Sequence, residues 1–178
     1  MLQTRALELL RSVSPYGEPL ENHCIRLAEF ALAIGLKEQL ETDEDLVRAA
    51  CFLHDIGLCV KYDTEKNYLK RGLSYFQEQS VKWGLDAEQR KTLDDALLYN
   101  HSLVKIPGID PQADLVRRAV SVEHSHGLVT QGLDRGFCRS VFVRIPRRGF
   151  DKVLLSFFKI ATIDDSPSTL FRIFFPKS

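Results

Sequence analysis

Three histidines and one aspartate are the residues of this sequence best suited to chemistry. His23, His54 and His101 fall within or at the ends of helical patterns, and Asp55 directly follows His54. Imidazole suits borderline transition metals and carboxylate suits harder cations, so the mixture fits Fe, Mn, Zn, Ni or Mg. Any one of these histidines alone is typical of a satisfied, partly buried side chain. Together they indicate one shared metal site.

The spacing of apolar residues predicts an all-α fold that places these side chains on separate helices. Helical patterns cover residues 20–35, 42–57, 68–83, 86–101, 110–119 and 150–160. Thr42 is the expected N-cap of the second pattern, Asp86 with Gln89 resembles a capping box, and Asp110 with Pro111 forms an N-cap and N1 pair. The connections between the patterns are short. We therefore expect a single compact helical domain over residues 1–178.

The C-terminal tail, residues 163–178, is too apolar to be left in water. Its centre, 170–175, holds leucine, isoleucine and three phenylalanines around one arginine. Large exposed apolar patches are uncommon on monomers. We expect the tail to dock on the domain as a short strand or irregular segment, or to cover a partner subunit in a homodimer.

Charge and composition narrow the classes of partner. The 178 residues include 24 Lys and Arg against 24 Asp and Glu, so the formal net charge is zero. This balance removes the global electrostatic argument for nucleic acid or a membrane as partner. Residues 1–12 lack the pattern of a secretion signal, and no apolar stretch approaches ~18 residues. The four cysteines lack C-x-x-C spacing, so we expect reduced thiols in a cytoplasmic protein.

Several motifs resemble a known family. The segment 51–58 reads Cys-Phe-Leu-His-Asp-Ile-Gly-Leu and, together with His23 and His101, resembles the HD-domain superfamily of helical metal-dependent hydrolases. Residues 116–127 and the Pro-x-x-Gly-Phe stretch at 146–150 resemble the cyanamide hydratase-like branch of that superfamily. The resemblance runs from the second helix to about residue 160, and it implies a helical fold that holds a divalent metal ion.

Two positions depart from the pattern of that branch. Val120 stands where the family has its last metal-ligating aspartate, and valine cannot ligate a cation. At about 100° per residue, Glu123 lies about 60° to one side of Val120 and His124 about 40° to the other, so either can reach a site that Val120 faces. Leu69 and Arg71 replace acidic residues of the branch, which favours an anionic substrate or a loss of catalysis.

The resemblance also implies roles for individual residues. Four side chains are expected to ligate the metal: His23, His54, Asp55 and Glu123. His124 is the alternative fourth ligand, and Asp55 would in addition orient the attacking water. His101 would contact the substrate or a second metal. Lys70 and Arg71 would neutralise an anionic group of the substrate.

Three functions follow from these features. The first is hydrolysis of a small phosphate ester or nucleotide by a water whose pKa the cation lowers. The second is hydration of a small nitrile-like molecule, as the cyanamide hydratase-like branch implies. The third is a non-catalytic domain of the same fold that binds a ligand or partner through the old cleft. Leu69, Arg71 and Val120 favour this third function over an intact enzyme of the branch.

Overall fold

The computed structural model describes residues 1–60, 67–160 and 167–176, and in these ranges it contains helices and no β-strand. The predicted all-α class is confirmed. The helices are α1 (Leu2–Val13), α2 (Glu18–Lys37), α3 (Glu44–Leu53), the 3-10 helix η1 (Ile56–Leu58), α4 (Tyr68–Gln79), the 3-10 helix η2 (Ser80–Lys82), α5 (Ala87–Tyr99), α6 (Pro111–His124), α7 (Arg135–Arg144), α8 (Phe150–Lys159) and α9 (Pro167–Phe174). None of them is both long and apolar enough to cross a bilayer.

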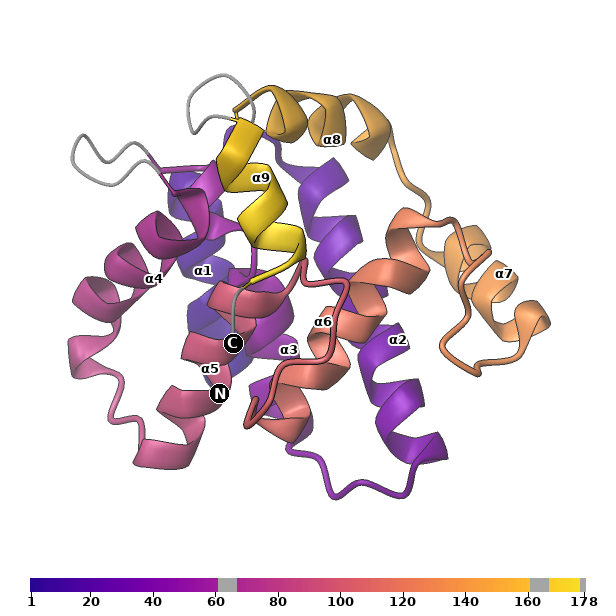
Figure 1. The fold of residues 1–178 in the computed structure, drawn as a ribbon, viewed down its shortest axis with the longest axis horizontal. Coiled ribbons are helices and arrows are strands. Elements are labelled where there is room, and N and C mark those ends of the chain that lie inside the picture. The colour runs from indigo at the N-terminus through magenta and orange to yellow at the C-terminus, as the bar shows by residue number, and fades with distance from the viewer. Residues whose placement is uncertain (61–66, 161–166, 177–178) are drawn as a thin grey trace.

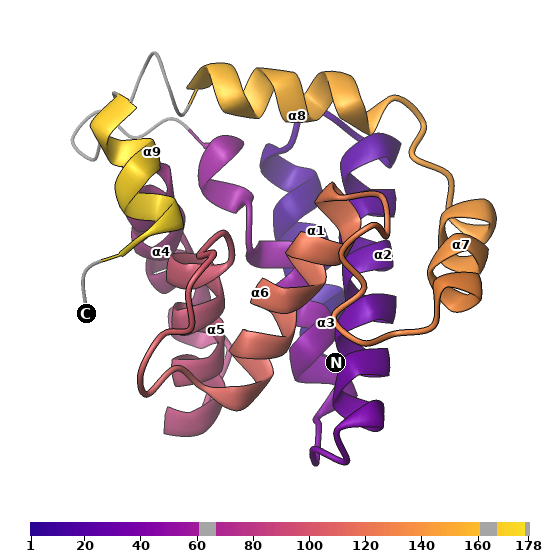
Figure 2. The same cartoon turned by 45° about the vertical axis from the view of Figure 1, so that its right-hand side comes forward.

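The helices α2, α3, α5 and α6 form the centre of the fold. α3 packs against α1, α2 and α5, while α6 packs against α2 and α5. Helix α8 spans one end of this bundle, and α7 lies on the outer side of α2 (Figures 1 and 2). The buried apolar residues of α2, α3, α5 and α6 belong to one continuous core. Because His23, His54 and His101 come from three of the packed segments, the core brings them to one end of the bundle.

Side-chain caps determine where several helices begin. Asp86 and Gln89 form the predicted capping box, and the predicted Asp110 cap accepts from the backbone at the start of α6. The N-cap of α3 is Asp43, whose side chain accepts from the Leu46 amide, so the expectation of Thr42 was wrong by one residue. Two consecutive good N-cap residues left that choice open to the tertiary packing.

Gly57 allows a close contact that shapes the turn after Asp55. A Cβ atom at Gly57 would lie 1.9 Å from the Tyr68 carbonyl oxygen and 2.7 Å from the Gly72 amide nitrogen. Glycine is therefore required where α4 crosses η1. Arg71 reinforces this crossing, because its Nε donates to the Gly57 carbonyl at 2.9 Å. The crossing holds the turn after Asp55 against α4.

The tail forms a helix over its described part. Residues 167–174 are α9, so the expectation of a strand or irregular segment was wrong; residues 163–166 and 177–178 lie outside the described ranges. The side chain of Ile173 is buried, and the Phe174 carbonyl accepts from the Leu103 amide at 2.9 Å. Apolar side chains three and four residues apart can share one helix face, which accounts for the helix in an apolar run.

Candidate metal centre

The three predicted histidines come from the second turn of α2 and from the C-terminal ends of α3 and α5. His23 lies within α2, His54 is the C-cap of α3, and His101 lies in the turn that follows α5. Asn100 ties two of these ends together, because its Nδ2 donates to the His54 carbonyl at 2.8 Å. Asp55 follows directly and precedes η1. All four candidate side chains are thus carried by packed helix ends or a buried helix face.

The structure brings His23, His54, Asp55 and His101 together. His23 Nε2 lies 3.3 Å from His54 Nε2, and Asp55 Oδ2 lies 3.0 Å from His54 Nε2 and 3.9 Å from His23 Nε2. The second carboxylate oxygen, Oδ1, lies 3.1 Å from His101 Nε2. His23, His54 and Asp55 each offer a ligand atom within 4.8 Å of the other two. This separation suits a single ion with bonds of about 2 Å to each atom.

The acceptor oxygens beside the far nitrogens leave two imidazole lone pairs facing each other. His54 Nδ1 lies 2.7 Å from the Cys51 carbonyl, which can only accept, so Nδ1 carries a hydrogen. His23 Nδ1 lies 3.2 Å from Glu123 Oε2, which also only accepts when ionised. Both Nε2 atoms of the neutral rings are then unprotonated and point toward Asp55. Two lone pairs and a carboxylate at such distances favour a cation between them.

The charges around Asp55 lead to the same requirement. Burial opposes charge on this carboxyl, but the adjacent imidazoles of His54 and His101 hold its pKa well below the usual range. Burial alone would lower the pKa of His54, yet Asp55 raises it overall. A positive charge is therefore favoured between Asp55 and His54. The residues present fit a divalent cation.

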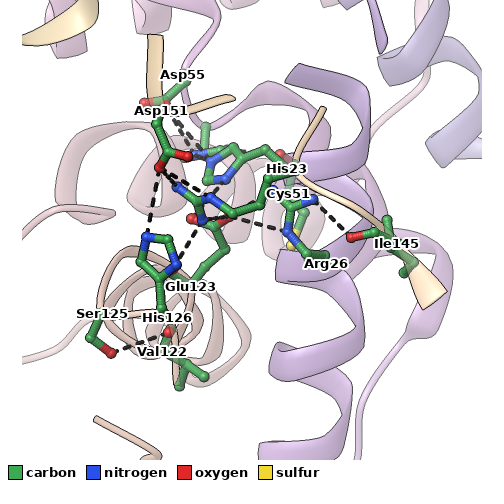
Figure 3. Close-up of polar contacts among 12 residues, drawn as sticks. His23, Arg26, Cys51, Asp55, Val122, Glu123, Ser125, His126, Ile145 and Asp151 are labelled. Carbon is green, nitrogen blue, oxygen red and sulfur yellow. Dashed lines mark hydrogen bonds and ion pairs between the residues drawn. The ribbon is translucent and has the colours of Figure 1, made fainter. Parts of the chain in front are cut away.

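Glu123, the expected fourth ligand, lies on the side of the His23 ring opposite to Asp55 (Figure 3). Its Oε1 accepts from Arg26 Nε at 3.1 Å, from Arg26 Nη2 at 2.7 Å and from Arg147 Nη1 at 2.7 Å. Burial opposes its charge, but His23, His124 and Arg26 together hold the pKa of Glu123 well below the usual range. Its carboxylate is ionised and already paired with two guanidinium groups.

A second group of potential ligands shares His23, and charge distinguishes the two. His23, Glu123 and His124 also offer ligand atoms within 4.8 Å of one another. In that group the carboxylate is neutralised by Arg26 and Arg147. The carboxylate of Asp55 has only imidazole partners within the described residues. A cation therefore gains more beside Asp55 than beside Glu123.

The Pro-x-x-Gly-Phe stretch forms the wall behind His23. The carbonyls of Ile145 and Pro146 accept from Arg26 Nη1, and Arg147 reaches Glu123. The ring of Phe150 stacks on His23 with centroids 4.0 Å apart and an angle of 11° between the planes. Neither Arg26 nor Arg147 was predicted to belong to the site. The available signal was an arginine on the apolar face of α2, one turn after His23.

A pocket of about 230 Å³ opens beside the candidate metal ligands. Asp55, His101 and His124 form its polar part; the remaining lining is Leu58, Tyr68, Leu154, Phe157, Phe158, Ile173 and Phe174. His124 Nε2 is buried with no hydrogen-bond partner among the described residues, and burial lowers the pKa of His124 to about 3. The polar groups of the pocket thus lie on the side of His23 and His54.

Three residues that were expected to adjoin the substrate or the metal do not line this pocket. Among the described residues, neither Lys70 nor Arg71 lines it: Lys70 is exposed, and Arg71 is buried against η1. Val120 is buried within the apolar core and offers no ligand atom. The described lining contains no lysine or arginine, so this described part of the pocket supplies no fixed cation to a substrate.

Comparison with known proteins gives one match. The family model of the HD domain matches residues 20–124, which is more than half of the chain and includes His23, His54, Asp55 and His101. No curated protein and no solved structure matches the chain.

Proposed function

The chain belongs to the HD domain family, and from this premise we propose that it is a metal-dependent hydrolase of a small molecule. The proposal rests on the convergence of His23 Nε2, His54 Nε2 and Asp55 Oδ2. Among the described residues, no lysine or arginine forms an ion pair with Asp55. A divalent cation bound there would lower the pKa of water and polarise the substrate. Its identity lies among Fe, Mn, Zn, Ni and Mg.

The residues around the pocket have distinct tasks in this proposal. Asp55 lies between His54 and His101, with one carboxylate oxygen toward each ring. His101 lines the pocket and holds a proton on Nε2 that it donates to Asp55 Oδ1, so the carboxylate keeps one orientation. The apolar walls from α8 and α9 exclude water from the substrate. Three protein ligands leave open coordination positions, as is usual for catalytic metal sites.

The pocket also restricts the substrate. Its apolar lining fits a small molecule with one apolar end and a reacting group beside Asp55 and His101. A phosphate ester of an apolar alcohol is the first candidate, because the bound cation would neutralise the negative charge of the phosphate. A neutral nitrile is the second, and the specific observation in its favour is that no lysine or arginine occurs in the described lining.

Elemental analysis is the experiment that tests the proposal. We expect about one divalent ion per purified chain and none in His54→Ala, whose folding is checked by circular dichroism. The loaded protein is then assayed with phosphate esters of small aliphatic alcohols and with cyanamide. Metal-free wild type after reconstitution with all five cations would contradict the proposal and favour a non-catalytic binding domain. Turnover of cyanamide alone would select the second substrate class.

A further inference from the structure

We infer that Glu123 is a positioning residue, held by Arg26 and Arg147, which sets the tautomer of His23 and aims its Nε2 at the metal. The inference rests on the proposed function in taking His23 Nε2 as a ligand atom. It assigns Glu123 to the opposite face of the ligand ring rather than to the metal itself.

The contacts of the Glu123 side chain separate its two oxygens. Oε1 accepts three hydrogen bonds, from Arg26 Nε, Arg26 Nη2 and Arg147 Nη1, at 2.7 to 3.1 Å. Oε2 lies 3.2 Å from His23 Nδ1 in an ion-pair contact, and among the described residues neither of these two buried atoms makes a hydrogen bond of normal geometry. The guanidinium groups thus hold one oxygen and leave the other for His23.

This arrangement selects one form of the imidazole ring. An ionised carboxylate can only accept, so the hydrogen of neutral His23 is held on Nδ1 and the lone pair on Nε2. His54 reaches the same form through the Cys51 carbonyl, at 2.7 Å from its Nδ1. Hydrogen bonding of the non-ligating nitrogen is the usual way in which proteins orient histidine ligands. The two ligands therefore use different acceptors for the same purpose.

Charge balance explains why Glu123 can do this without binding a second metal ion. Arg147 also contacts Asp151, from Nη2 at 2.7 Å and from Nε at 3.2 Å. The two arginines and the two carboxylates of this cluster cancel in charge. Phe150, stacked on His23 at 4.0 Å, limits the tilt of the ring. Phe150 thus restrains the plane of the ring, while Glu123 selects which nitrogen faces the metal.

Glu123→Gln tests the inference because the amide can retain one oxygen for the arginines while it turns its NH₂ toward His23. His23 Nδ1 would then accept, and its hydrogen would move to Nε2. We expect long-range ¹H–¹⁵N correlation spectra of the metal-free proteins to show His23 as the Nδ1–H tautomer in wild type and as Nε2–H in Glu123→Gln. Zn²⁺ affinity, measured by competition with a chromogenic chelator, should fall about 10- to 100-fold.

The control is Glu38→Gln, which removes a carboxylate paired with Arg118 outside the site and should change neither readout. Unchanged His23 tautomer and unchanged Zn²⁺ affinity in Glu123→Gln would overturn the inference. A change in the Co²⁺ absorption spectrum that indicates a lost ligand would also overturn it, because Glu123 would then bind the metal directly. If Glu123→Gln does not fold, Arg147→Met is measured in the same way, and an unchanged tautomer and affinity would count against the inference.

The same experiment separates this inference from the proposed function. Wild type that binds none of the five cations would contradict the metal-dependent hydrolase. The tautomer of metal-free His23, compared between wild type and Glu123→Gln, would still show whether Glu123 positions the ring.

Discussion

Asp55 and Glu123 are two buried carboxylates that contact opposite nitrogens of the same imidazole ring. Asp55 is 2% exposed and meets only the rings of His23, His54 and His101 among the described residues. Glu123 is 0% exposed and meets two guanidinium groups in addition to His23. Burial does not distinguish these two residues, and the side chains that neutralise them do. A buried carboxylate without a fixed cation is the one that creates a place for a metal ion.

The largest expected effect comes from Asp55→Asn. This change removes the anionic ligand, so affinity for Zn²⁺ should fall by more than about 100-fold, beyond the 10- to 100-fold typical of an outer contact. Although burial opposes its charge, His54 and His101 hold the pKa of Asp55 well below its usual range, so the ionised carboxylate stabilises the metal-free fold. Its loss should therefore also lower the free energy of unfolding in urea at neutral pH. Chelator competition and urea titration with EDTA measure the two quantities. Stoichiometric metal in Asp55→Asn would show that Glu123 and His124 form the site instead.

Glu123→Leu should lower stability through the loss of a buried ion pair with arginine rather than of contacts with imidazoles. It leaves Arg26 and Arg147 without their shared carboxylate, and loss of one partner from a buried ion pair costs about 3–5 kcal/mol of unfolding free energy. Adding Arg26→Met to Glu123→Leu should recover a large part of that loss. Urea titration in EDTA measures both variants beside wild type. A loss below about 1 kcal/mol in Glu123→Leu would mean that the arginines find water or other partners.

The contrast between these carboxylates also marks what the sequence can predict. His54 and Asp55 are adjacent at a helix end, and His23 lies beside the apolar positions of its own pattern, so local periodicity was sufficient to nominate them. The contact between Arg26 and Glu123 spans 97 residues, and that between Glu123 and Arg147 spans 24. No local pattern encodes such a pairing. Angular spacing on α6 placed Glu123 near the site and did not reveal which nitrogen of His23 it faces.

The fold shows a similar division between local and long-range information. The capping box at Asp86 and the N-cap at Asp110 depend on neighbouring residues and were predicted correctly. The apolar wall of the pocket is formed by α8 and α9. Its lining residues, among them Leu154, Phe157 and Ile173, are brought together only by the tertiary fold. The sequence therefore predicted the side of the pocket that carries the candidate metal ligands better than the apolar side formed by α8 and α9.

Val120→Asp tests whether a further carboxylate without a fixed counter-charge strengthens metal binding. Val120 is 4% exposed and lies one turn before His124 on α6. A new carboxylate there should raise Zn²⁺ affinity about tenfold if it reaches the cation, and should lower the metal-free stability by about 1–3 kcal/mol because a polar group is buried. Chelator competition and urea titration report the two effects separately. Lower stability with unchanged affinity would mean that this position does not face the metal.

The smallest effect is expected from Lys70→Ala. Lys70 is exposed, and it lies outside the described lining of the pocket and outside the contacts of Asp55 and Glu123. A solvated charge without a fixed partner contributes little to a screened site, so metal affinity and KM should stay within about twofold of wild type. The neighbouring Arg71→Met should instead lower stability by about 1–3 kcal/mol, because the buried Gly57 carbonyl loses its donor. A rise in KM above about fivefold in Lys70→Ala would restore the expectation that this side chain neutralises an anionic substrate. It would then supply, from outside the pocket lining, the positive charge that Asp55 lacks and Glu123 has.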